Sequence, residues 1–147
     1  MNPEFEDCLK RNKIKPFSRG KNLVSKELKS AKSDLEIAKE SFEKAHYKWA
    51  TIQCYYSMFH ATRALIYAEN YREKSHHCLL VALRALYVET RRLNFKFLEN
   101  LERAKTLREN ADYYGDFSQI GAKDILDKAK EFLEKTKGIL SSREKEK

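Results

Sequence analysis

The stretch that most restricts the fold of this chain runs from Trp49 to Glu69, because its pattern predicts a helix with no plainly solvated side. At about 100° per residue, the side chains divide into three faces. The first face is made of small residues, which would let another helix backbone come close: Ala50, Cys54, Ser57, Ala61, Ala64 and Ala68. The second face is bulky and needs a core: Tyr55, Met58, Phe59, Thr62, Leu65 and Ile66. Such a helix is expected at the centre of a bundle.

The third face of this helix is polar and aromatic, with Tyr56, His60, Arg63 and Tyr67. Polar groups that leave water need partners, so this face requires an explanation. His60 can serve as a general base, since the ordinary pKa of histidine is about 6.5, or it can be a hydrogen-bonded core residue. The face is therefore the first candidate for a site.

Length and composition predict the fold class. A chain of 147 residues is long enough for one core, so we expect a single domain over 1–147. Four glycines and two prolines leave little material for the turns of a many-stranded sheet, which favours an all-α fold. We expect an antiparallel up-and-down bundle of about five helices. No apolar run approaches the roughly 20 residues of a membrane span, and the N-terminus does not resemble a signal peptide, so we expect a cytoplasmic protein.

The helix boundaries follow from caps and from the spacing of apolar residues. Residues 2–13 predict a short first helix, and 14–22 an irregular connection. Ser25 is the predicted cap of a long helix that ends near Ala45, and Ser75 is the predicted cap of the helix after the central one. Two further helices are predicted over about 97–113 and 121–140, followed by a frayed charged tail, 141–147.

The three cysteines are odd in number and far apart, so we expect neither a disulfide framework nor a metal site, and Cys54 is predicted to be a reduced core residue. No phosphate-binding glycine loop or metal-ligand spacing is present, so we expect no cofactor and no metal. The net charge of +8 favours an anionic partner. Two segments concentrate this charge: the basic N-terminal segment, 10–22, and the stretch from Arg91 to Lys96. They are either solvated surfaces or surfaces that bind anionic polymers in a salt-dependent way.

Arg108 interrupts an apolar line of the predicted fourth helix, so it must be paired or must line a cleft. Asp112 lies four residues later on nearly the same face and can be its partner. The pair either ties two helices together or belongs to a functional site. His76 and His77 open the preceding helix as caps, surface residues or ligands, and Tyr113 can stack on a base or pack at the rim of the bundle.

Three motifs together resemble the HEPN superfamily, and more narrowly its small stand-alone archaeal and bacterial members. They are YYSMFHATRAL at 55–65, KSH at 74–76 and RENADY at 108–113. The resemblance covers roughly Lys26 to Leu140. It implies a helical bundle, commonly dimeric and often encoded with a small nucleotidyltransferase partner as a toxin–antitoxin pair. Many HEPN proteins are metal-independent ribonucleases that use an Arg, four to six residues, then His. No histidine follows Arg108 at that spacing, which leaves catalysis open.

Three functions are therefore to be weighed. The first is a HEPN-type module that binds nucleotide or RNA and works with a nucleotidyltransferase. The second is a metal-independent ribonuclease toxin that uses Arg108 and Asp112, with His60 or His77 as base. The third is a non-catalytic structural or interaction protein. The ligand-binding candidates are Tyr56, His60, Arg63, His76, Arg108, Asp112 and Tyr113.

Two expectations about assembly and charge complete the sequence-based interpretation. We expect a homodimer, because the central helix carries more apolar faces than a small monomeric bundle covers. If the polar faces of the central and fourth helices meet, two arginines and an imidazole share a cleft with one carboxylate, that of Asp112. The excess positive charge would suit a phosphate.

Overall fold

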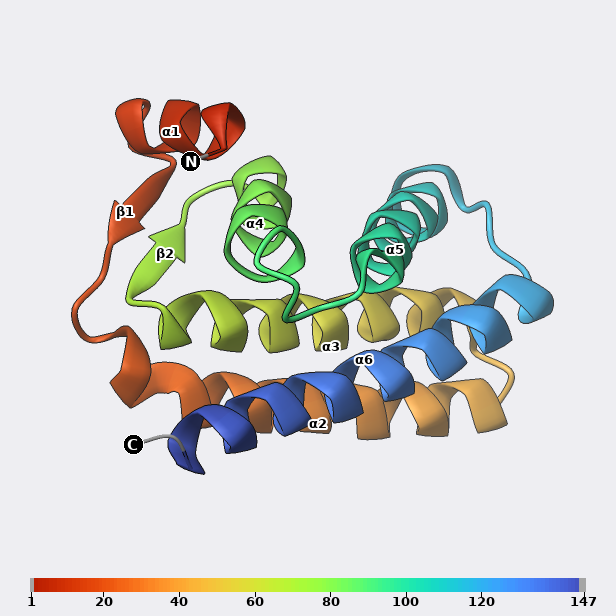
Figure 1. Cartoon of the computed structure of the whole chain (residues 1–147). Helices are drawn as coiled ribbons and strands as arrows, with labels where there is room; N and C mark the ends of the chain where they lie inside the picture. The colour runs from red at the N-terminus through yellow and green to blue at the C-terminus, as the bar shows by residue number, and fades with distance from the viewer. Residues whose placement is uncertain (1, 146–147) are drawn as a thin grey trace.

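The computed structural model describes residues 2–145, with side chains up to Ser142. Figure 1 shows α2, α3 and α6 running along the molecule, with α4 and α5 set across α3 and seen nearly end-on. This arrangement confirms the all-α helical bundle. The elements are α1 (Pro3–Lys10), β1 (Ile14–Pro16), α2 (Gly20–Glu43), α3 (Tyr47–Ala68), β2 (Tyr71–Glu73), α4 (His76–Leu83), a π-helical turn η1 (Arg84–Val88), α5 (Phe95–Tyr114) and α6 (Gln119–Lys145).

Helix α3 is the centre of the fold, as its sequence predicts, and it packs against α2, α4, α5 and α6. Its small face lies against α2, where the buried Ser57 hydroxyl donates to the Ala31 carbonyl oxygen at 2.7 Å. At the start of α2, a Cβ on Gly20 would collide with the Tyr67 carbonyl oxygen, so only glycine permits this approach. The other helices bury most of α3. This helix therefore has no large uncovered apolar face that would require a dimer, contrary to the reason given from the sequence.

Several boundaries differ from the predictions. Helix α2 begins at Gly20. The exposed Ser25 therefore lies inside the helix and does not cap it. Ser75 is confirmed as the cap of α4, where its hydroxyl oxygen accepts from the Cys78 N–H. Helix α6 continues to Lys145, past the start of the predicted frayed tail, and 146–147 lie outside the described residues. None of the described helices is long and apolar enough to cross a bilayer.

The irregular connection predicted for 14–22 contains a strand. Strand β1 pairs antiparallel with β2, with Ile14 opposite Glu73 and Lys15 opposite Arg72. Successive strand residues point to opposite faces, and here Ile14 and Glu73 are buried. A three-residue strand has no local signal, because it forms only by pairing with a segment much later in the chain.

The expectation of no disulfide is also wrong. Cys8 of α1 and Cys78 of α4 form a disulfide, with 6.1 Å between their Cα atoms. The pairing is invisible in the sequence, because α1 and α4 meet only in the tertiary fold. Cys54 is confirmed as a buried free thiol, and burial raises its pKa to about 12. Such a thiol is inert.

Candidate functional site

The centre of the candidate site is the guanidinium of Arg108, which α5 places against the polar face of α3. Its Nη2 donates to the Tyr56 hydroxyl at 3.0 Å and lies 3.3 Å from Asp112 Oδ2, which confirms the predicted ion pair. The group also lies over the rings of Tyr56 and Tyr113, at 5.4 and 5.3 Å from their centroids. We call these four residues the Arg108 cluster. The aromatic contacts hold the guanidinium in one orientation.

The Arg108 cluster has unused hydrogen-bonding capacity. The Arg108 side chain is 15% exposed, and its buried Nε has no hydrogen-bond partner among the described residues. Tyr113, at 65% exposure, and the half-buried Asp112 keep the cluster open to solvent on one side. A buried N–H without an acceptor is unusual in a folded protein, and a bound water or ion is one explanation of it.

His76 is the histidine beside this cluster. Its ring stacks on Phe59 at 5.1 Å, and its Nδ1 lies 2.6 Å from the Tyr55 hydroxyl. Burial, followed by the charges of Arg108 and Lys105, lowers the pKa of His76 below its ordinary value of 6.5. The imidazole is therefore neutral at pH 7.

We infer the tautomer of His76 from the only place to which the Tyr55 hydroxyl can donate among the described residues. Burial raises the pKa of Tyr55, so its hydroxyl keeps its proton. No other described residue accepts that proton, so the hydroxyl donates to Nδ1 of His76. A neutral imidazole that accepts at Nδ1 carries its hydrogen on Nε2. His76 therefore presents an N–H donor at Nε2, close to the charge of Arg108.

His60 and Arg63 follow Tyr56 on the polar face of α3, but their surroundings differ from those of Tyr56. His60 Nδ1 is 2.7 Å from Glu27 Oε2, and its Nε2 is 3.7 Å from Asp34 Oδ2. Arg63 makes a bidentate pair with Glu73, at 3.0 and 3.2 Å. We call these five residues the carboxylate network. The expected cleft with a single carboxylate is wrong, because three further carboxylates already satisfy His60 and Arg63.

The ring of Phe59 links the two groups, since the Arg63 guanidinium lies 4.5 Å from its centroid and His76 stacks on it. Of the candidate residues, Tyr56, Arg108, Asp112 and Tyr113 are in contact, His76 is beside them, and His60 and Arg63 are in the carboxylate network. The sequence-based interpretation missed Tyr55, Phe59, Glu27, Asp34 and Glu73 as site residues. The spacing of seven between Glu27 and Asp34 places both on one side of a helix and was the available signal.

Similarity to known proteins identifies the family of this chain. The family model described as "HEPN domain" matches residues 24–140. The chain belongs to the HEPN domain family. It is 28% identical over 127 residues to "Putative toxin MJ0142" of Methanocaldococcus jannaschii, covering 85% of this chain and 86% of the relative. It is 27% identical to "Putative toxin MJ0605" of the same organism, covering 75% and 83%, and 29% identical to a "UPF0332 protein" of Archaeoglobus fulgidus, covering 78% and 92%.

For this HEPN chain, the structure changes the choice of histidine in the ribonuclease alternative. That alternative used His60 or His77 to replace the histidine missing after Arg108. His77 is exposed, and both nitrogens of His60 face carboxylates. Only His76 combines partial burial, a defined hydrogen bond and proximity to Arg108. Sequence spacing missed its importance because α4 and α5 are separate elements.

Proposed function

We propose that this protein is a toxin-type HEPN protein that binds the phosphate of a nucleotide or of RNA at the Arg108 cluster. The observation that carries the proposal is the Arg108 guanidinium, whose Nε–H has no hydrogen-bond partner among the described residues and whose charge acts on the imidazole of His76. Guanidinium and imidazole N–H groups bind phosphate oxygens through charge-assisted hydrogen bonds. The names of two relatives support the toxin assignment. The family resemblance supports a nucleotidyltransferase partner.

A metal-independent ribonuclease is the second candidate, because an arginine and a histidine share the site. Its base would be Nε2 of His76, which must then carry no hydrogen. That tautomer points an N–H at the Tyr55 oxygen and leaves the buried Tyr55 hydroxyl hydrogen without an acceptor. The hydrogen bond therefore favours binding over cleavage. A purely structural role would account for the ion pair between Arg108 and Asp112. It would not account for the position of His76.

Incubation with RNA and chelator separates the candidates. We expect a mononucleotide or short RNA to bind the parent protein without cleavage, and His76→Ala to weaken binding about tenfold or more, the effect of one hydrogen bond to a charged group. His77→Ala is the matched control, because His77 is the exposed neighbour of His76. RNA cleavage that persists in chelator and is lost in His76→Ala would establish the ribonuclease instead.

The pH dependence gives a second readout of His76. The folded state lowers the pKa of His76, so the unfolded chain takes up a proton at a higher pH than the folded protein does. The contribution of neutral His76 to stability is therefore complete above about pH 6.5. It falls as the pH drops through the folded-state pKa. The imidazolium that forms in the same range attracts phosphate more strongly. We therefore expect binding to strengthen while stability falls, whereas a nuclease that uses His76 as base would lose activity there.

The homodimer remains a prediction, and the exposed apolar residues at the join of α5 and α6 now support it. They are Tyr114, Phe117 and Ile120. Such clusters commonly mark interfaces. Light scattering at roughly tens of micromolar should show a dimer. Ile120→Glu should give a monomer, whereas Ile37→Glu on α2 should not. A monomeric parent protein would contradict the prediction.

A further inference from the structure

The solvent face of the two-stranded sheet carries four positive charges. Ile14 and Glu73 occupy the buried face, so the alternation of the strands places Lys13, Lys15, Arg72 and Lys74 together on the other. Lys15 lies directly opposite Arg72, and the Lys74 N–H donates to the Lys13 carbonyl oxygen beside them. We call these four residues the cationic hairpin face. Like charges directly opposite each other destabilise an antiparallel pair, so this face is unfavourable on its own.

No described residue neutralises the cationic hairpin face. None of its four side chains forms an ion pair with a described carboxylate, and the only nearby acidic side chain of the strands, Glu73, is turned inward to Arg63. The close contact with Lys15, and then the charges of Arg72 and Lys13, lower the pKa of Lys74. The Arg72 guanidinium lies over the Phe17 ring at 5.1 Å, which limits its movement. The four charges thus share one face, and none of the described carboxylates pairs with them.

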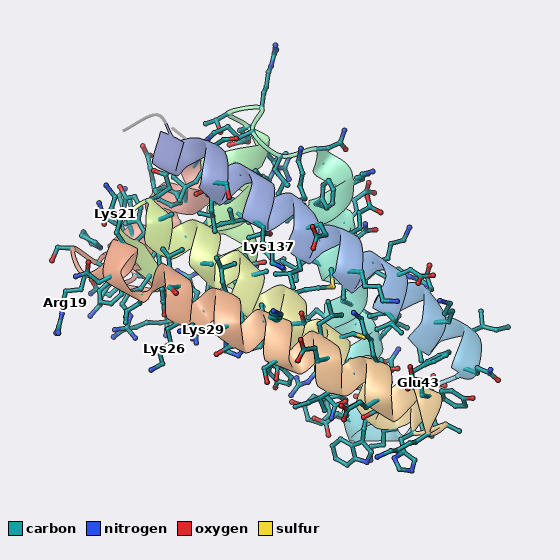
Figure 2. All side chains as sticks on the ribbon, turned by 90° about the horizontal axis from the view of Figure 1, so that it is seen from below. Arg19, Lys21, Lys26, Lys29, Glu43 and Lys137 are labelled. Carbon is teal, nitrogen blue, oxygen red and sulfur yellow. A yellow bond between two sulfur atoms is a disulfide. The ribbon has the colours of Figure 1, made fainter. Side chains whose placement is uncertain are left out.

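The second basic stretch predicted from the sequence differs in this respect. Arg92 pairs with Glu69 at 2.6 Å, and Lys96 pairs with Glu131 at 2.9 Å. The positive surface is instead extended at the hairpin end, where β1, β2 and the start of α2 lie together (Figure 1). Figure 2 shows the following basic side chains gathered toward the end of the molecule at which α2 begins: Arg19, Lys21, Lys26 and Lys29.

We infer that the cationic hairpin face binds the phosphate backbone of single-stranded RNA and leads the strand to the Arg108 cluster. Lys74 is separated from His76 only by the extended residue Ser75, so their Cα atoms lie about 7 Å apart. Lys105 adds its charge near His76. Lys105 is paired with Glu109, so the short chain segment from Lys74 to His76 is what joins the hairpin to the proposed phosphate site. The inference rests on the proposed function only for the strand's destination.

A phosphate backbone fits this face better than an acidic protein does. Protein partners are usually anchored by apolar side chains, and the four residues that define this face are all cationic. Nucleic-acid backbones bind through charge alone, with release of counterions. The row of charges on two short strands offers that interaction and no base-specific readout, so we expect little sequence preference.

The test is binding of a short labelled single-stranded RNA over about 50 to 200 mM salt. The patch variant carries Lys13→Gln, Lys15→Gln, Arg72→Gln and Lys74→Gln. The control variant loses the same charge elsewhere, through Lys39→Gln, Lys44→Gln, Lys123→Gln and Lys135→Gln. At about 0.7 per contact, the patch variant should flatten the slope of log affinity against log salt by up to about 3 and weaken binding at least about tenfold at low salt. The control variant should change both only slightly.

Other results would overturn the inference. Equal losses in the two variants would mean that net charge alone attracts RNA, and competition by polyglutamate at the same concentration as RNA would identify an acidic protein as the partner. If the patch variant does not fold, the same measurement is made on the double variant Lys15→Gln and Arg72→Gln. Its slope of log affinity against log salt should be flatter than that of the parent protein by about 1.4. Arg108→Ala should leave the hairpin part of the slope intact. Hairpin-dependent RNA binding without any effect of Arg108 would refute the proposed function and the destination of the strand, and would leave RNA binding by the cationic hairpin face standing.

Discussion

Replacing Arg108 by alanine should abolish most ligand binding and leave the fold nearly as stable as before. The guanidinium supplies the charge of the Arg108 cluster, and its loss should weaken mononucleotide or short RNA binding by about tenfold to a hundredfold. Stability should fall by only about 1 kcal/mol, because Asp112 is 35% exposed and water can solvate it when its partner is gone. Thermal melts with and without ligand measure both quantities.

Arg103→Ala is the matched control on the same helix. Arg103 makes an ion pair with Asp124 at 3.1 Å and is far more exposed than Arg108. We expect this variant to change neither ligand binding nor melting temperature appreciably. If instead Arg108→Ala lowers the melting temperature strongly and the parent protein shows no stabilisation by ligand, Arg108 is a structural residue and the proposed site is wrong.

Breaking the disulfide between Cys8 and Cys78 should produce the largest loss of stability. The two cysteines are 70 residues apart in sequence, and closing a loop of that length restricts the unfolded chain by about 4 kcal/mol at 25 °C. The bond also fastens α1 to α4, the helix that begins with His76. Denaturant unfolding with and without reductant should show the difference as a lower midpoint for the reduced protein.

Two variants control for reduction elsewhere. The double variant Cys8→Ala and Cys78→Ala should unfold near the midpoint of the reduced parent protein and should not respond to reductant. Cys54→Ala should keep the response, because Cys54 is a free buried thiol. An unfolding midpoint of the parent protein that is the same with and without reductant would show that the bond does not stabilise the fold.

The candidate site divides into a part that local spacing predicts and a part that it does not. The pairing of Arg108 with Asp112 follows from a separation of four residues on one helix, and the structure has it. A separation of three residues put His60 and Arg63 on the polar face of α3, which is correct. Spacing could not show that Glu27, Asp34 and Glu73 pair with these two side chains. The carboxylates come from other elements, α2 and β2.

The sequence by itself determined the helical architecture, the central position of α3 and the cap at Ser75, because each depends on residues within a few positions of one another. Only the tertiary structure decided the hairpin of β1 and β2, the bond between Cys8 and Cys78, and the hydrogen bond that joins His76 to Tyr55. Periodicity specifies which side chains share a face of one element. Which groups meet across elements depends on how the faces pack, and hydrogen bonds and charge pairs at those contacts then determine which side chains are left to bind a ligand.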